Sequence, residues 1–296
     1  MSIFMKRLFL LMTLILPATF VLQAQDFSYG VKTGLNFNTF RGPLETANGV
    51  DVEEYDNTTG FHVGALFNLA FTDLMGARFE LLYSQKGARY RFDGPSYQFL
   101  EADAGGQILT TGDKFITLNI SNSYIDIPVM GYVKATDWLE FSVGASVGFL
   151  VNSTAAGELI YNGVSPLGNT LPEFSFTLEY NYYNDEANSA DFTDSGAPIL
   201  IDGQAVTLPT QVGAYYALNR EDGSRFNTLD IGLVGGLSLY LNDNLFVSGR
   251  LNYGLTDISN SDYDFSRVQL DDDKNLLPRN DKDTNLSIQA SVGFSF

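Results

Sequence analysis

The last twelve residues, "NLSIQASVGFSF" (285–296), carry an apolar side chain at every second position from Leu286 to Phe296. Small or polar residues stand between them. An α-helix would place residues two apart about 200° around its axis and would scatter the apolar set over opposite faces. A β-strand places the whole set on one face. The stretch therefore predicts a strand with one apolar face, which needs partner strands because chain ends otherwise fray.

The composition of the 296 residues fits a strand-rich protein. There are 28 glycines, 39 tyrosines and phenylalanines taken together, and only 18% charged residues. There is no cysteine, which excludes disulfides, thiolate catalysis, cysteine-ligated metals and a cysteine-linked lipid anchor.

The first 24 residues have the pattern of a secretory signal peptide. Lys6 and Arg7 precede the apolar run 8–16, and cleavage is expected after Ala24. The alternative, a membrane-anchoring helix, would need about 20 apolar residues. The mature chain, 25–296, then holds 15 basic and 35 acidic residues and is expected to be one domain without a nucleic-acid partner.

Seven further stretches show the same alternation as the last one. Such a pattern fits either a soluble β-sandwich or a closed barrel. With the terminal strand, the expected strands cover 27–37, 61–71, 77–83, 125–133, 139–151, 229–241, 245–255 and 286–296.

The lengths of strands and connections favour a barrel in the outer membrane. Many of the strands reach eleven residues, whereas soluble strands average five or six. Short turns alternate with long connections, as periplasmic turns and exterior loops do in outer-membrane barrels. The turns are "TDLMG" (72–76), the pair at 137–138 and "NDN" (242–244); the long connections are 41–58, 91–115, 152–227 and 257–284.

The distribution of charge supports the same fold. The four long connections hold 27 of the 35 acidic residues and 9 of the 15 mature basic ones, whereas the apolar strand faces hold almost none. The opposite faces hold a nearly balanced set, as an enclosed lumen requires. We therefore expect an all-β, closed, antiparallel transmembrane barrel of eight strands in the cell outer membrane, with a lumen charge network of Lys32, Arg78, Glu80, Lys86, Asp126, Lys134, Glu140, Asp230 and Arg250.

The connection 152–227 leaves the strand count open. Its segment 174–182 alternates, and Asp202–Gly203 is a hairpin signal within 199–208. These could be two more spanning strands, giving ten. We favour eight, with the strands around 139–151 and 229–241 extended beyond the membrane under an exterior hairpin, since both counts are even.

Four segments resemble the PorT-like outer-membrane barrels of Bacteroidetes. They are "GVKTGLNF" (30–37), "FELLYSQKG" (79–87), "YIDIPVMGYVK" (124–134) and "GLVGGLSLYL" (232–241). The resemblance implies a Gram-negative outer membrane, with its lipid and lipopolysaccharide as surroundings and the barrel assembly machinery as a partner that reads the terminal Phe296. A named member of the family is associated with type IX protein secretion, so secretion-system proteins are further expected partners.

Residues for chemistry are few. His62 is the only histidine, and Glu80 on the next strand is its one nominated carboxylate; a hydrogen-bonded lumen residue is the simpler interpretation. We therefore expect no catalytic residues and no cofactor. In "LDDDKNLLPRND" (270–281), Asp271, Asp272 and Asp273 are weak candidate ligands for a divalent cation, against the simpler expectation of a solvated acidic loop.

The sequence thus predicts a non-enzymatic barrel that acts in outer-membrane structure, surface interaction or protein secretion. A small-solute channel is the first alternative, although an eight-stranded barrel has an interior just filled by side chains. An outer-membrane hydrolase is the second, and it would need a nucleophile beside His62.

Overall fold

The computed structural model describes residues 26–216, 218 and 223–296. The expected signal peptide lies outside the described residues. Within them, no helix is long and apolar enough to cross a membrane, a result that concerns helices alone. Eight long strands form one ring: β1 (Asp26–Arg41), β5 (Thr58–Ala70), β6 (Met75–Glu101), β7 (Gln107–Thr136), β8 (Leu139–Val164), β14 (Leu229–Tyr240), β15 (Leu245–Gly254) and β18 (Thr284–Ser295).

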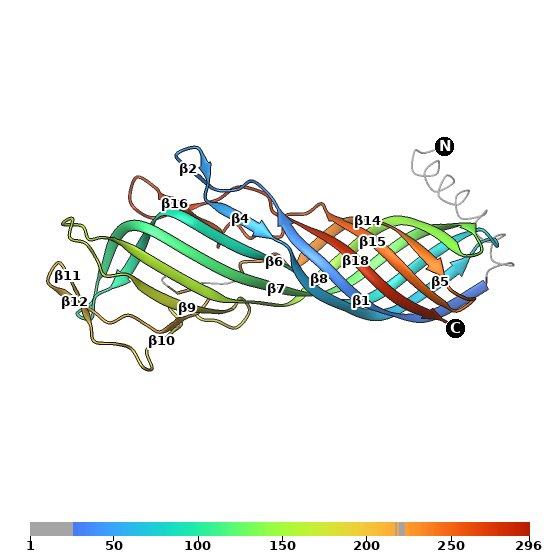
Figure 1. The fold of residues 1–296 in the computed structure, drawn as a ribbon, viewed down its shortest axis with the longest axis horizontal. Coiled ribbons are helices and arrows are strands. Elements are labelled where there is room, and N and C mark those ends of the chain that lie inside the picture. Colours follow the sequence, from blue (N-terminus) through green and yellow to red (C-terminus); the bar gives the residue numbers. More distant parts are fainter. Residues whose placement is uncertain (1–25, 217, 219–222) are drawn as a thin grey trace, which may run out of the picture.

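Hydrogen-bonded pairing closes the ring. Each strand pairs antiparallel with the next in the order just given. The seam is the pairing of β1 with β18, which runs from Gly30 opposite Ser295 to Arg41 opposite Thr284. The expected eight-stranded antiparallel barrel is therefore confirmed, and it forms one half of an elongated molecule (Figure 1).

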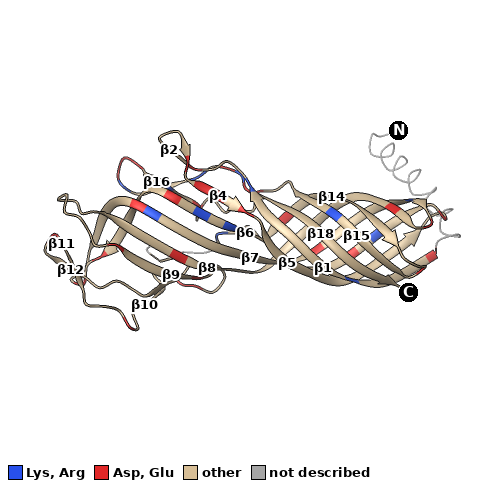
Figure 2. Ribbon diagram, in the orientation of Figure 1, with Lys and Arg blue, Asp and Glu red and all other residues tan. Residues whose placement is uncertain are grey.

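The two faces of the barrel wall carry the polarity of a barrel in lipid. Large apolar side chains point outward: Val143 is 70% exposed, Leu233 54% and Ile288 56%. Charged and polar side chains point inward and are buried. Figure 2 shows where Lys, Arg, Asp and Glu lie along the barrel strands. A sandwich in water would need the reverse arrangement.

Short turns lie at one end of the barrel and long connections at the other. The turns 71–74, 137–138 and 241–244 share the end at which β1 begins and β18 finishes (Figure 1). In an outer-membrane barrel this is the periplasmic end. The long connections build the opposite half of the molecule, which is then extracellular.

The prediction of a long loop at 91–115 is wrong. β6 and β7 continue through most of it as a paired ladder and are joined only at 102–106. The reason is that the alternation persists, with Tyr90, Phe92 and Ile116 buried on the inner face. Charged residues on the outer face gave this stretch the composition of a loop.

The expected loop at 152–227 is also partly strand. β8 continues to Val164, and β9 (Phe174–Asn181) pairs with it at 154–161, beyond the part of β8 that pairs with β14. β9 therefore lies outside the ring, and the ten-stranded alternative is wrong. Of the two strands expected to extend outward, β8 does so, whereas β14 begins only at Leu229.

The predicted hairpin at Asp202–Gly203 is confirmed. These residues join β11 to β12 and have φ values of 51° and 86°. Positive φ at both central positions is the geometry that favours Asp-Gly. The other extracellular strands are short: β2 (Thr46–Ala47), β3 (Val50–Asp51), β4 (Glu53–Asp56), β10 (Ala190–Asp191), β11 (Ile199–Ile201), β12 (Gln204–Val206), β13 (Gln211–Val212), β16 (Phe265–Leu270) and β17 (Leu276–Pro278).

The inner face changes character where the closed ring ends. Inside the barrel it is polar, whereas in the extracellular half it forms an apolar core. That core contains Tyr90, Phe92, Leu118, Tyr161 and Phe176. A shift in the β7–β8 register between Ser123 and Tyr124 lies close to this change. The extracellular half thus has its own packed interior.

Candidate functional site

The barrel lumen is filled by a buried network of ion pairs. Glu80 on β6 contacts Lys32 on β1 at 3.3 Å and Arg250 on β15 at 2.7 Å. Arg78 contacts Glu140 at 2.9 Å. On the extracellular side of these pairs, Lys86 lies between Asp126 and Asp230, at 2.9 Å from each: Lys86–Asp126 and Lys86–Asp230.

Eight of the nine residues expected in the lumen network belong to it, four cations and four carboxylates, all at most 6% exposed. Lys134 stands apart. Its ammonium lies 5.8 Å from the centre of the Tyr240 ring at the periplasmic mouth, and it makes no ion pair with any described residue. Without Lys134 the lumen charges balance completely, as burial in a low-dielectric interior demands.

His62 lies between two partners that the sequence did not indicate. Its Nδ1 is 2.7 Å from Asn36 Oδ1, and its Nε2 is 2.9 Å from Ser291 Oγ. The Asn36 amide nitrogen donates to Ser84 Oγ and to the carbonyls of Phe61 and Gln85, so its oxygen must accept from His62. Nδ1 therefore carries the proton, and Nε2 accepts from the Ser291 hydroxyl.

This polarity is that of a serine–histidine–asparagine triad, but its location does not suit catalysis. His62 and Asn36 are fully buried and Ser291 is 6% exposed. A nucleophile must reach a substrate carbonyl, whereas Ser291 Oγ faces the filled lumen. The nominated partner Glu80 is occupied by Lys32 and Arg250. The arrangement fits a satisfied polar core better than an active site.

The two carboxylate groups of 257–284 differ in burial. Asp271 is partly exposed and caps its own turn, because its oxygens accept from the backbone amides of Asp273 and Asn275 and from the Asn275 side chain. A role for Asp271–Asp273 in cation binding stays a prediction. Among the described residues, metal-ligand spacing is found instead in Asp264, Asp281 and Asp283, whose nearest oxygens lie within 4.8 Å of one another.

That second group is already partly neutralised. Arg225 contacts Asp264 at 2.9 Å, and Arg279 contacts both Asp281 and Glu53. Burial, together with the neighbouring Asp264 and Asp281 carboxylates, raises the pKa of Asp283 to about 6. These residues have a structural explanation as an ion-pair cluster at the base of the extracellular half.

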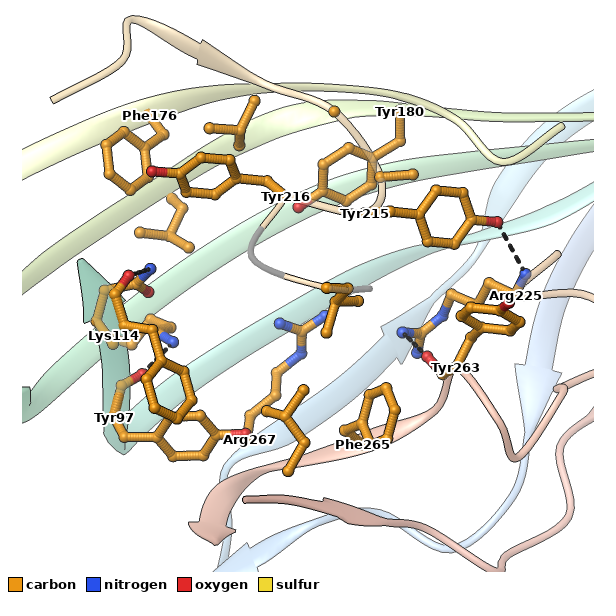
Figure 3. A pocket seen from close by; sticks show the side chains of 18 of the residues that line it. Tyr97, Lys114, Phe176, Tyr180, Tyr215, Tyr216, Arg225, Tyr263, Phe265 and Arg267 are labelled. Carbon is orange, nitrogen blue, oxygen red and sulfur yellow. Dashed lines mark hydrogen bonds between the residues drawn. The ribbon is translucent and has the colours of Figure 1, made fainter. Parts of the chain in front are cut away.

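The extracellular half contains a cavity of about 150 Å³ between β6, β7, β9, β16 and residues 212–216 and 218. Nine of the described residues that line it are aromatic: Tyr97, Phe99, Phe176, Tyr180, Tyr182, Tyr215, Tyr216, Tyr263 and Phe265. Figure 3 labels all of these except Phe99 and Tyr182. Three cations, Lys114, Arg225 and Arg267, also line it. In the close-up the Arg267 guanidinium lies in the middle, with Lys114 on one side and Arg225 on the other.

The three cations have few partners. Lys114 is 6% exposed and donates to the Tyr97 carbonyl at 2.5 Å, between the rings of Tyr97 and Tyr161. Burial, together with the neighbouring Arg267 cation, lowers the pKa of Lys114 to about 7. Of the three, Arg225 alone has a carboxylate partner among the described residues, namely Asp264.

Arg267 is held in place without being neutralised. Its guanidinium lies 5.3 Å from the centre of the Tyr90 ring. The nearby Glu45 carboxylate accepts from the backbone amides of Arg267 and Val268 and from the Ser266 hydroxyl. Glu45 thus fixes the backbone of β16, and the Arg267 side chain remains directed into the cavity (Figure 3).

Sequence reasoning missed this cavity because its walls come from segments expected to be loops. Lys114 lies in 91–115, and Arg225 and Arg267 lie in the long connections 152–227 and 257–284. The available signal was the tyrosine-rich stretch 180–183 together with Tyr215 and Tyr216. Solvated loops rarely need so many aromatic residues.

Comparisons with known proteins find distant matches among solved structures and one matching family. Among solved structures, similarity extends to Ail of Yersinia pestis, at 10% identity and a TM-score of 0.35 over 92% of this chain and 99% of that one. It extends also to OprG of Pseudomonas aeruginosa, at 10% identity and a TM-score of 0.32 over 92% and 97% of the two chains. A third, the toluene transporter TodX of Pseudomonas putida, has 10% identity and a TM-score of 0.19 over 94% and 91%.

These likenesses are too distant to carry a functional argument. No curated protein matches the sequence. The family described as outer membrane protein beta-barrel domain matches residues 23–260, which is most of the chain and includes seven of the eight ring strands. The chain therefore belongs to the outer membrane protein β-barrel domain family, and it is an integral protein of the outer membrane.

Proposed function

We propose that this protein is a non-enzymatic outer-membrane barrel of the PorT-like kind, in which a sealed ring anchors an extracellular structure for surface interaction. The observation that carries the proposal is the lumen network. Ion pairs join β1 to β6, β6 to β15, β6 to β8, β6 to β7 and β6 to β14. The lumen is therefore cross-linked from several sides of the ring.

Opening a path through this lumen would separate buried charges. Removing one partner of a buried pair typically costs about 3–5 kcal/mol, because the other charge is left uncompensated. The interior of an eight-stranded barrel is in any case just wide enough for its own side chains. A sealed barrel leaves the extracellular half as the part of the molecule that can meet a partner.

A channel is the second candidate function, and one feature favours it. A vestibule of about 540 Å³ opens at the periplasmic end and is bounded by Arg78, Glu140, Lys134 and Tyr240. In a channel, the Arg78–Glu140 pair at its inner end would have to separate. A sealed barrel agrees better with the other buried ion pairs, those of Glu80 and Lys86, which would also have to separate in a channel.

Conductance measured in planar bilayers distinguishes the sealed barrel from the channel. We expect the purified protein to give no steady open-channel current, and we expect Glu140→Gln to introduce transient openings because Arg78 loses its carboxylate. Steady current from the wild-type protein would overturn the sealed barrel. An Arg91→Gln variant is the control, since its ion pairs with Glu54 and Asp56 lie outside the lumen.

The biological setting follows the same proposal. Outer-membrane lipid and lipopolysaccharide would surround the ring, the barrel assembly machinery would insert it, and secretion-system proteins are the partners that kinship to PorT-like barrels suggests. Affinity capture of the intact protein from outer membranes would identify such partners. Recovery of the barrel with secretion components would favour secretion over a stand-alone surface role.

A further inference from the structure

The extracellular cavity combines two kinds of wall. One is aromatic, with Tyr and Phe side chains from four parts of the chain. The other is cationic, with Lys114, Arg225 and Arg267. Among the described residues, Arg225 is the one of these three cations that pairs with a carboxylate, that of Asp264.

Retaining these cations inside an aromatic cavity is costly. Moving a charge out of water is unfavourable unless it is paired. Lys114 is buried with one hydrogen bond, to a backbone carbonyl, and its neighbour Arg267 carries the same sign of charge. Cation–π contacts with Tyr97, Tyr161 and Tyr90 recover part of the cost. An anion placed among the three side chains would pair with Lys114 and Arg267, which have no carboxylate partner among the described residues.

The size of the cavity limits what else the ligand carries. A cavity of about 150 Å³ is of the size that holds one six-membered ring. It is not fully enclosed, so the remainder of a larger molecule could extend outward.

The polar atoms of the wall favour a ring with hydroxyl groups. In the part of the chain that the structure describes, the hydroxyls of Tyr180 and Tyr216 have no hydrogen-bond partner, and both residues are half-buried against the cavity. A sugar ring offers apolar C–H faces to aromatic rings and hydroxyls at its edge. A carboxylate on that ring would accept charge-assisted bonds from Arg267 and Lys114.

We propose that this cavity binds an acidic pyranose, a six-membered sugar ring that carries a carboxylate, either free or as the terminal unit of a polysaccharide. Arg267 and Lys114 bind the carboxylate, and the sugar ring packs against the tyrosine-rich wall. The inference names a ligand for the surface interaction proposed above and rests on that proposal. It is independent of whether the lumen conducts, so bilayer recordings and the binding test fail separately.

The test is isothermal titration of the full-length protein in detergent micelles with glucuronate, β-methyl glucuronide, glucose and acetate, each up to about 10 mM. We expect binding of glucuronate and no detectable binding of glucose or acetate, since each lacks one of the two recognised parts. Binding of both glucuronate and its methyl glycoside identifies a terminal polysaccharide unit. Binding of glucuronate alone identifies the free sugar acid.

Two variants locate the site. Arg267→Gln and Lys114→Met should each weaken glucuronate binding by about tenfold or more, as expected for the loss of a charge-assisted contact. Arg91→Gln removes an exposed arginine from the same extracellular half and should leave the affinity unchanged. Two independent variants guard against one that fails to fold.

The proposal is overturned if glucuronate does not bind, if glucose or acetate binds equally well, or if Arg91→Gln weakens binding as much as Arg267→Gln. Equal binding of acetate would reduce the cavity to a simple anion site. Equal binding of glucose would remove the role of the cations.

Discussion

Arg250 on β15 and Glu80 on β6 meet inside the barrel with Nη1 and Oε2 at 2.7 Å, although 170 residues separate them in the chain. Glu80 also accepts from Lys32 on β1. One carboxylate therefore pairs with two cations here, whereas Lys86 pairs with two carboxylates on the extracellular side of the lumen. The two local imbalances have opposite sign and cancel across the network.

Loss of the Glu80 charge should destabilise the barrel. Glu80→Gln leaves both Lys32 and Arg250 buried without a carboxylate, and we expect a cost of about 3–5 kcal/mol in the free energy of unfolding. Urea titration of the folded, heat-modifiable form on gels measures it. Glu54→Gln, which breaks an exposed pair with Arg91, should cost about 0–1 kcal/mol. Equal costs for the two would show that the lumen pairs are solvated.

The outer face of the barrel should reject charge according to depth. Val143 is 70% exposed near the middle of the membrane-facing part of β8, and Val143→Arg should cost about 2–4 kcal/mol. Leu167→Arg is the control, because Leu167 is 77% exposed in an extracellular turn and should tolerate the change. Unfolding from lipid vesicles measures both variants. Equal tolerance would contradict the assignment of Val143 to lipid.

Ser291 should be inert toward serine-directed reagents. Its hydroxyl donates to His62 Nε2 as a catalytic serine would, yet it faces the filled lumen. We expect that a fluorophosphonate does not label the folded protein. We also expect Ser291→Ala to hydrolyse an ester substrate no more slowly than the wild-type protein. Labelling of wild-type protein that disappears in His62→Gln would instead establish a reactive pair and contradict a non-enzymatic barrel.

Alternation was enough to predict the eight strands and to divide their side chains between two faces, whereas strand lengths, connection lengths and charge were needed to assign the polar face to the lumen. Inward positions such as Arg78 and Glu140 follow directly from a period of two. The individual pairs do not follow, because contacts across the lumen depend on register and on ring closure. His62 illustrates this: Asn36 and Ser291 reach it from β1 and β18, the two strands that meet at the seam.

The extracellular half was less predictable for a different reason. A strand that leaves the membrane keeps its alternation but no longer needs an apolar outer face. Arg89 and Arg91 on the outside of β6 therefore suggested a loop, although Tyr90 and Phe92 continue the buried face. The cavity cations lie on these extensions and on the segments packed against them, so no single stretch of sequence indicates that they meet.

The buried carboxylate Asp283 should make stability depend on pH. Its pKa is raised to about 6, above the ordinary value of 3.8, so the folded state holds this proton more tightly than the unfolded state. The stabilising contribution is complete below about pH 4 and is lost as the pH rises through about 6. Asp283→Asn removes the buried charge, and we expect it to raise stability at pH 7.5 by up to about 3 kcal/mol.

The gain in stability from Asp283→Asn should vanish at acidic pH. Thermal unfolding in detergent at pH 4 and pH 7.5 compares the variant with wild type, and the gain should be confined to pH 7.5. Asp272→Asn, an exposed change in the same connection, is the matched control and should show no such dependence. A variant that is less stable than wild type at pH 7.5 would mean that the Asp283 charge is needed by a partner.

Divalent cations should protect the acidic connection 257–284 from protease on intact cells. The four long connections carry a net charge of −18 and would stand beside the phosphates of lipopolysaccharide, so bridging calcium would reduce their mutual repulsion. We expect cleavage within 152–227 and 257–284, slower in millimolar calcium than in sodium of matched ionic strength, while the turn at Trp138 stays uncut.

Because Asp271 is engaged in its own turn, the double change Asp272→Asn and Asp273→Asn is the informative variant and should abolish the calcium effect. Equal rates in calcium and sodium would reduce the effect to ionic screening, and cleavage at Trp138 from outside would invert the proposed orientation.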